Sequence, residues 1–316
     1  MVALPIATIS PTIAAIDAAV EAGEERKHDR VIRCSSLGKP CERAGWYAFR
    51  WVHEPEQFSG RMLRLFDTGN VEETRMIEWL EQVGVIVFAE DPDTDQQWEV
   101  VALDGHLVGH LDGIAHGILE APATPHLLEC KTHNAKSFAQ LQKHGVAVAK
   151  PEHVAQMQIY MHLKGLTRAF YLAKNKDTDE LYAERIHYDA AHAAALMAKA
   201  ERIKAANEPP ARISDDPNSF ACKFCSSRPV CHLQGGTILR NCRTCLHSEP
   251  FREGPMWFCH RHETILQISD QETGCPYHLY LPGLIAGEQV DADPEKETVT
   301  YKLADGSMWT DGEGRA

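Results

Sequence analysis

The sequence contains no long hydrophobic run. Of its 316 residues, 44% are hydrophobic and 24% are charged, a composition typical of a globular protein that buries a core. The apolar opening, residues 1–9, carries no basic side chain and is interrupted by Pro5, with Pro11 close behind. We therefore expect neither a signal peptide nor a membrane anchor, and we place the chain in the cytoplasm with no membrane partner.

An excess of basic residues is also missing, because the net charge is −13. Taken alone, this charge argues against a nucleic-acid partner, since proteins that bind phosphates release counterions through Lys and Arg. The acidic residues are unevenly distributed, however, with runs at residues 90–95 and 288–297, and residues 131–176 are rich in Lys. Bound divalent ions also reverse the local sign of a carboxylate site. The charge therefore does not exclude a DNA-binding enzyme.

Ten cysteines occur without a secretory signal. In such a chain a high cysteine content indicates metal sites rather than disulfides. Seven of the ten lie between residues 222 and 275, and two pairs have CxxC spacing, so these are not scattered core thiols. Cys34 and Cys130 lie outside the groups described below, and we expect them to be buried thiols.

Helical periodicity and strand alternation follow one another along the first two thirds of the chain. The order helix, strands, helix, strands, helix is typical of an α/β core whose central strands carry the chemistry. Helices are expected at residues 11–26, 61–83, 151–165 and 189–207. Strands are expected at residues 98–103, 106–115, 126–131, 168–173 and 181–188.

The sharpest local pattern is acidic. Glu129 and Lys131 are separated by one residue in an expected strand, so they share a face while Cys130 points into the core. Asp112 lies on the preceding strand, close enough to meet Glu129. Two such carboxylates form a hard oxygen site suited to Mg²⁺ or Mn²⁺. A lysine beside them is placed to orient or activate a water that attacks a phosphodiester.

Two further features flank these strands. Gln156 and Tyr160 are four residues apart on an expected helix, so they share one face and can reach a phosphate or a base. Earlier, Gly69 interrupts the helical pattern, which indicates a bend or a close backbone approach. Glu72 and Glu73 follow it, and a carboxylate there would complete the metal ligands.

In this order, Gly69 to Glu73, Gly109-xx-Asp112, Glu129-x-Lys131 and Gln156-xxx-Tyr160 resemble the motif series of RecB-like PD-(D/E)xK nucleases. The resemblance spans roughly residues 30 to 235. It implies a restriction-endonuclease-like α/β core, with a central mixed sheet flanked by helices. It also implies that Glu73, Asp112 and Glu129 bind Mg²⁺ or Mn²⁺, that Lys131 is the catalytic lysine, and that Gln156 and Tyr160 face the substrate.

The expected function is metal-dependent hydrolysis of DNA. We expect an exonuclease acting on single- or double-stranded ends in recombination, repair or phage DNA processing, in a bacterial or phage-infected cell. An endonuclease of the same fold is an alternative. Another is a catalytically weak DNA-binding subunit of a helicase or recombinase complex, which the net charge favours. The sequence departs from the family at Glu73, where many members have His, so either Glu72 or Glu73 is the ligand.

The cysteines divide into two groups. One early cysteine with a late C-x2-C-x5-C resembles the iron–sulfur staple of AddB-type and CRISPR-associated exonucleases, which implies a [4Fe-4S] cluster, or Zn²⁺ in its place, on Cys41, Cys222, Cys225 and Cys231. The spacing of the second group is typical of a small zinc ribbon on Cys242, Cys245, Cys259 and Cys275. A histidine can replace one of these thiols, the candidates being His247, His260, His262 and His278. A rival grouping places one zinc on Cys222, Cys225, Cys242 and Cys245.

Four parts are expected along the chain. They are an N-terminal helical extension (1–30), a nuclease domain with the cysteine staple (31–235), a zinc-ribbon-like module (236–283) and an acidic tail with a hairpin near residues 304–306 (284–316). The module is expected either to stabilise the fold or to contact DNA. Contacts to DNA would use Arg240, Arg243, Arg252 and Arg261, with Trp257 or Phe258 as stacking surfaces.

Overall fold

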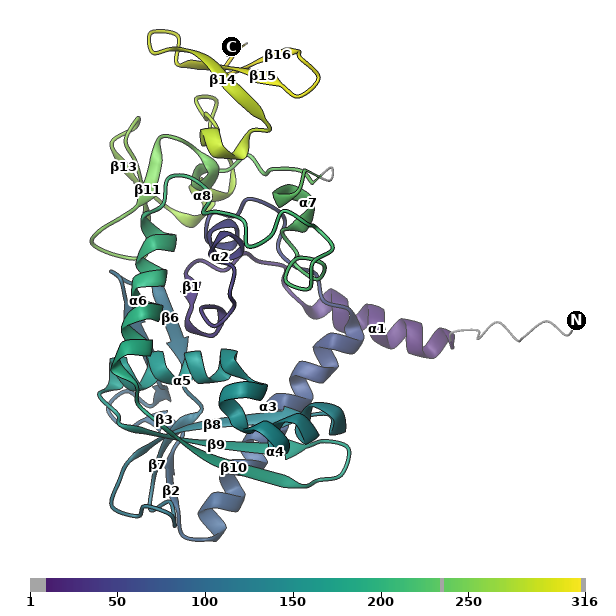
Figure 1. Cartoon of the computed structure of the whole chain (residues 1–316), viewed down its shortest axis with the longest axis vertical. Helices are drawn as coiled ribbons and strands as arrows, with labels where there is room; N and C mark the ends of the chain where they lie inside the picture. The colour runs from purple at the N-terminus through teal and green to yellow at the C-terminus, as the bar shows by residue number, and fades with distance from the viewer. Residues whose placement is uncertain (1–9, 234–235, 314–316) are drawn as a thin grey trace, which may run out of the picture.

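A five-stranded mixed sheet forms one end of the molecule (Figure 1). The computed structural model describes residues 10–233 and 236–313. Only the central pair, β8 and β9, is parallel, and the other neighbours are antiparallel. The predicted mixed α/β class is therefore confirmed. In sheet order the strands are β10 (Leu181–His187), β9 (Arg168–Asn175), β8 (His126–His133), β7 (Gly113–His116) and β2 (Ile86–Phe88).

Helices cover both faces of this sheet. The helix α3 (Gly60–Gln82) packs Met76 and Leu80 against Leu128 and Cys130 on one face. The opposite face is covered by α4 (Ala135–Ala149) and α5 (Pro151–Lys164), and α6 (Ala190–Ala205) packs on α5 and on α2 (Glu42–Phe49). No helix in the described ranges is long and apolar enough to cross a membrane.

Local sequence signals fix the ends of these helices. Asp189 caps α6 by accepting hydrogen bonds from the backbone N–H groups of Ala191 and His192, as expected for an N-cap. Pro151 occupies the first turn of α5, where a missing N–H has no cost. The same helix ends at Gly165, whose φ of 68° is left-handed. The predicted starts of both helices are therefore confirmed.

Three details differ from the sequence predictions. The strand expected at residues 106–115 is two strands, β6 (Leu107–His110) and β7, which belong to different sheets and separate at Asp112. The alternation of apolar residues continues across this break and conceals it. Gly69 lies within an uninterrupted α3, and a Cβ there would meet nothing within 4 Å, so the predicted bend or close approach is wrong. The helix α4 was not predicted.

Smaller elements complete the described chain. The strand β6 joins β1 (Ile32–Arg33) and β5 (Glu99–Ala102) in a second sheet, and β3 (Glu90–Asp91) pairs with β4 (Gln96–Gln97). Two three-stranded sheets follow toward the C-terminus. The first consists of β11 (Ser248–Pro250), β12 (Trp257–Cys259) and β13 (Thr264–Leu266). The second consists of β14 (Gly287–Asp293), β15 (Thr298–Leu303) and β16 (Met308–Asp311). The short helices are α1 (Pro11–Gly23), η1 (Cys34–Ser36), α7 (Arg228–Cys231), η2 (Cys242–Thr244), α8 (Ile268–Glu272) and η3 (Pro282–Leu284).

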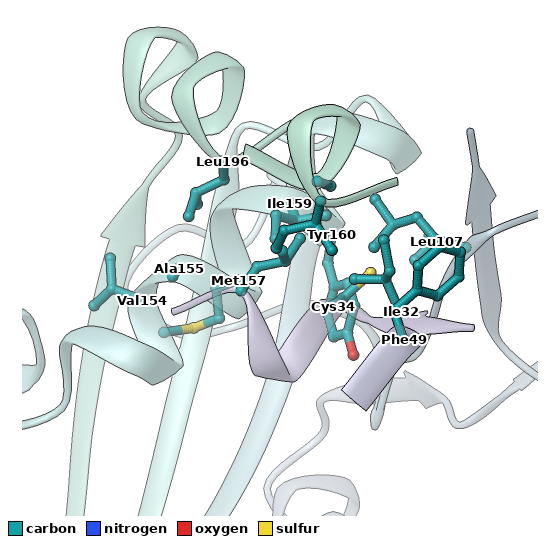
Figure 2. Packing of buried hydrophobic residues seen from close by; sticks show 14 of the residues in the cluster. Ile32, Cys34, Phe49, Leu107, Val154, Ala155, Met157, Ile159, Tyr160 and Leu196 are labelled. Atoms are coloured by element: carbon teal, nitrogen blue, oxygen red, sulfur yellow. The ribbon is translucent and has the colours of Figure 1, made fainter. Parts of the chain in front are cut away.

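The apolar core is continuous from the part that contains the five-stranded sheet into residues 236–283. Trp257, Leu266 and Leu281 belong to the same buried cluster as the residues under α5. Figure 2 shows Met157, Ile159 and Tyr160 of α5 lying close to Ile32, Cys34 and Leu107 in this cluster. The tail sheet has a separate small cluster around Val299 and Tyr301, and its predicted hairpin is present as β15 and β16.

Two fully buried arginines join residues 236–283 to the rest of the protein. The guanidinium of Arg243 lies 3.7 Å from the ring centre of Trp51 and donates to the backbone oxygens of Arg30 (3.0 Å) and Phe49 (2.9 Å). Arg50 donates to the backbone oxygen of Arg243 in return, at 3.2 Å. Carbonyl oxygens and aromatic rings thus replace the water around both cations.

Candidate active site and thiol clusters

The central strand β8 carries the predicted catalytic tripeptide. It has neighbours on both sides, and alternate side chains point to opposite faces of the sheet. Leu128 and Cys130 point toward α3 and are buried there, as expected. Glu129 and Lys131 therefore point toward α5, where Glu129 is fully buried.

Asp112 joins these residues from the break between β6 and β7. Its Oδ2 accepts a hydrogen bond from the backbone N–H of Cys130 at 2.7 Å, which fixes the carboxylate against β8. The amine of Lys131 lies 2.6 Å from Glu129 Oε1 and 3.6 Å from Asp112 Oδ2. Two carboxylates from neighbouring strands therefore share one cation, as the spacing predicted.

The ionisation of this group follows from its burial. Burial raises the pKa of Glu129 to about 7, with Asp112 adding to the effect and Lys131 opposing it. Burial alone would lower the pKa of Lys131, but Glu129 and Asp112 raise it above the ordinary value. The lysine thus stays protonated at neutral pH, whereas Glu129 is close to its titration point.

Glu73, on α3, is the third carboxylate of the group. Burial raises its pKa to about 7, and Asp112 raises it while Lys131 lowers it, so the three side chains lie within one electrostatic field. Glu72 points elsewhere and forms ion pairs with Lys174 at 2.7 Å and Arg75 at 2.8 Å. Of the two candidates, the structure therefore brings Glu73 to the site.

Gln156 and Tyr160, the predicted pair on α5, differ in their surroundings. The amide nitrogen of Gln156 lies 3.4 Å from Glu129 Oε2 and 3.3 Å from the hydroxyl of Tyr160. Tyr160 is only 2% exposed, and a Cβ on Gly109 would lie 2.4 Å from its ring. Gln156 thus borders the carboxylates, and Tyr160 supports it from the interior.

Sequence reasoning missed a neighbouring polar network. The hydroxyl of Tyr171 on β9 lies 2.9 Å from His133 Nε2 and 2.9 Å from His153 Nδ1. The available signal was positional, since His133 continues the alternation of Glu129 and Lys131. His153 likewise precedes Gln156 by three residues on α5, so it shares the same helical face.

The first cysteine group meets across a wide separation in sequence. Cys41 precedes α2, whereas Cys222, Cys225 and Cys231 lie on and before α7, and all four line one small cavity of about 20 Å³. That volume holds roughly one water molecule. The rival grouping is not favoured by this arrangement, because Cys242 and Cys245 line a different cavity.

The second group surrounds that other cavity, which measures about 440 Å³. Burial raises the pKa of Cys242 to about 12, and the other three thiols of the group add to the effect, so all four are neighbours. His262 Nε2 lies 3.7 Å from Cys275 Sγ. His247 and His278 also line the cavity, and His260 instead pairs with Glu249 at 3.2 Å.

Neither the carboxylates nor the thiols form a complete ligand shell within the described part of the chain. Across residues 10–233 and 236–313, no group of three or more His, Cys, Asp or Glu side chains is arranged around a metal position. The donor chemistry nevertheless fits, since carboxylates suit Mg²⁺ or Mn²⁺ and clustered thiolates suit zinc or iron–sulfur.

The prediction that residues 236–283 contact DNA through these arginines and aromatic rings is wrong in part. Arg243 and Trp257 are fully buried and cannot meet a ligand, because they belong to the joint with the core. Arg261 is engaged with Glu297 at 2.9 Å and lies over the ring of Tyr277. The arrangement supports the stabilising role for this part of the chain.

Comparison with known proteins yields remote structural similarities only. No family model matches the chain, and no curated protein matches it. The alkaline exonuclease LHK-Exo from Laribacter hongkongensis is similar with 16% identity and a TM-score of 0.40, over 60% of this chain and 90% of that one. Its complex with dAMP gives 16% and 0.39 over the same shares. The structure of SSO0001 is similar with 15% identity and a TM-score of 0.42, over 70% and 95%. At these values no family is assigned.

Proposed function

We propose that this protein is a metal-dependent DNA nuclease of the PD-(D/E)xK type. The observation that supports it is the convergence of Asp112, Glu129 and Lys131 on one face of the central sheet, with Glu73 beside them. Glu73 is near enough for its charge to raise the pKa of Glu129, so three carboxylates share one electrostatic field with Lys131. Carboxylates are gathered in this way, against their mutual repulsion, where divalent cations bind.

The roles of the side chains follow from their charges. Glu73, Asp112 and Glu129 would hold Mg²⁺ or Mn²⁺, which supplies charge neutralisation at the phosphate and lowers the pKa of an attacking water. Lys131, whose amine lies between Glu129 and Asp112, would stabilise negative charge on the phosphate. Gln156 donates toward Glu129 and fixes the orientation of that carboxylate.

The test is degradation of end-labelled single- and double-stranded DNA with Mg²⁺ or Mn²⁺. Lys131→Ala is expected to lower kcat by about 10²–10³-fold, the usual effect of removing one positioned electrostatic group. Lys174→Ala is a suitable control, because it removes a buried lysine of the same sheet that pairs with Glu72. The product ladder distinguishes the exonuclease, which we favour, from an endonuclease.

A second candidate function is a non-catalytic DNA-binding subunit working with a helicase or recombinase. It is favoured by the net charge of −13 and by Glu73 in place of the histidine of many relatives. DNA binding without cleavage by metal-loaded, folded protein would support this function over the nuclease. Cleavage that persists in Lys131→Ala would contradict the site proposed above.

The thiol groups are proposed as structural metal centres. Cys41, Cys222, Cys225 and Cys231 would hold a [4Fe-4S] cluster or Zn²⁺, and Cys242, Cys245, Cys259 and Cys275 would hold Zn²⁺. Elemental analysis of purified protein, together with its visible absorption, tests both assignments. Iron with labile sulfide in the wild type, lost in Cys222→Ser but kept in Cys245→Ser, would assign the cluster to the first group.

A further inference from the structure

Two histidines and three lysines adjoin the carboxylate site. His133 and His153 both contact the hydroxyl of Tyr171, and their ring centres are stacked 6.0 Å apart. Burial lowers the pKa of His153 to about 3, with Lys131, His133 and Lys150 adding to the effect. Burial likewise lowers the pKa of His133 to about 4, with Lys150, Lys131 and Lys176 contributing. Both rings are therefore neutral. Lys150 and Lys176 lie beside them, because the backbone N–H of His153 donates to the carbonyl of Lys150 at 3.0 Å and that of Lys176 donates to the carbonyl of His133 at 2.9 Å.

Among the described residues, neither Lys150 nor Lys176 forms a side-chain ion pair, although the chain as a whole is acidic. Both side chains are partly exposed. Lys131 and Lys174, by contrast, are paired with carboxylates. Unpaired cations beside neutral imidazoles form a local excess of positive charge, which favours an anion.

The hydrogen bonds of the network fix the order of its donors and acceptors. The phenol of Tyr171 has one proton, because burial raises its pKa above the ordinary value, so it donates to one histidine and accepts from the other. Ser137 Oγ lies 3.2 Å from His133 Nδ1 at the far end. If Ser137 donates to His133, and His133 to Tyr171, then Tyr171 donates to His153 Nδ1. In that order the N–H of His153 is at Nε2, which makes no hydrogen bond within the described part of the chain.

We propose that His153, Lys150 and Lys176 form a subsite for a backbone phosphate next to the scissile one, with Tyr171 as the positioning residue that orients His153. The subsite rests on the proposed nuclease function, because its occupant is the same DNA strand. A phosphate oxygen accepts from His153 Nε2–H, and its charge is balanced by the two lysines. DNA binding therefore favours the arrangement in which Tyr171 donates to His153 Nδ1 and the N–H of His153 is at Nε2.

The experiment uses the full-length protein with Ca²⁺ and a fluorescent single-stranded oligonucleotide, and measures Kd by anisotropy. His153→Ala is expected to raise Kd about 10-fold, the effect of one charge-assisted hydrogen bond. His153→Gln, which keeps an N–H near Nε2, should recover part of the loss. Tyr171→Phe should raise KM while leaving kcat within about twofold. His162→Ala is the control, since His162 lies on the same helix but contacts Tyr188.

Single neutral methylphosphonate substitutions along the oligonucleotide locate the phosphate. The wild type should lose affinity at one position beside the cleavage point, and His153→Ala should be insensitive there. Equal sensitivity of both proteins at every position, or an unchanged Kd in His153→Ala, would overturn the subsite. Position-specific binding without any cleavage would leave the subsite intact and reject the nuclease, so the two failures are distinguishable.

Discussion

The carboxylate site and the thiol clusters hold their polar groups together by opposite means. Glu129 lies on β8, Glu73 lies on α3, and Asp112 directly precedes β7 and is bonded to the backbone of β8, so regular secondary structure holds the carboxylates in place against their own repulsion. The thiols lie mostly on turns and short helices, and Cys259 lies at the end of β12. The comparison teaches that the first region is rigid and electrostatically strained before any metal binds. In the second region, metals would link turns that are far apart in the sequence, such as those that carry Cys41 and Cys222.

Removing each kind of metal should therefore have different consequences, and this is the largest expected difference. Omitting Mg²⁺ and Mn²⁺ should abolish cleavage reversibly and leave Tm within about 3 °C. Cys222→Ser or Cys245→Ser should lower Tm by roughly 10 °C or more, because a lost structural metal removes several kcal/mol of folding energy. Cys130→Ala, which removes a core thiol outside both groups, is the control for thermal melting and should lower Tm less.

Adjacent glutamates on α3 separate stability from function. Glu72→Gln should lower the free energy of unfolding by about 1–2 kcal/mol, because Lys174 loses one of its two carboxylate partners and keeps Asp179, and it should preserve cleavage. Glu73→Gln should have the reverse pattern: lost cleavage and a gain of about 1 kcal/mol without metal, since repulsion from Asp112 is relieved. Urea unfolding and cleavage rates measured on both variants test this, and equal effects would contradict the placement of Glu73.

Two glycines test how tightly the site is supported. Gly109→Ala should cost about 1–3 kcal/mol and reduce cleavage, because the new methyl group would lie 2.4 Å from Tyr160 and push it toward Gln156. Gly69→Ala, in open space within α3, should stabilise the protein by about 1 kcal/mol. Chemical denaturation resolves both shifts, and a stable, fully active Gly109→Ala would show that Tyr160 does not support the site.

A further expected effect is on the pH dependence of stability. Glu73 and Glu129 have folded pKa values of about 7 against ordinary values of 4.5, so between these pH values only the folded chain keeps the protons. The stability of the metal-free protein should therefore fall as pH rises from about 4.5 to about 7 and level off above. Thermal melting across this range should show a shallower slope in Glu73→Gln. The same protons compete with metal, so metal affinity should strengthen as pH rises through 7.

Strand periodicity was sufficient to predict which side chains lie together on β8 and beside it. Glu129, Lys131 and Asp112 meet because alternation on β8 and pairing with β7 are local consequences of the sequence. The network on Tyr171 was not predictable in this way. It depends on the parallel pairing of β8 with β9, two strands separated by two helices.

Long-range packing also decided the fate of Arg243. A basic residue between two cysteines suggested an exposed contact, whereas its partners Arg30 and Phe49 lie about two hundred residues earlier in the chain. Similarly, the division of residues 106–115 into two strands depends on which sheet each half joins. Neither outcome is encoded in nearby residues.

The paired burial of Arg50 and Arg243 determines where the chain can be shortened. A protein ending near residue 240 would leave Arg50 without the carbonyl of Arg243 and would expose Trp51 to water. A protein ending just before β14 would keep that joint and lose the tail sheet with its contacts to Leu279, Tyr280 and Arg261. Shortening from the C-terminus should therefore stop before residue 283, because residues 236–283 and the part with the five-stranded sheet depend on each other for folding.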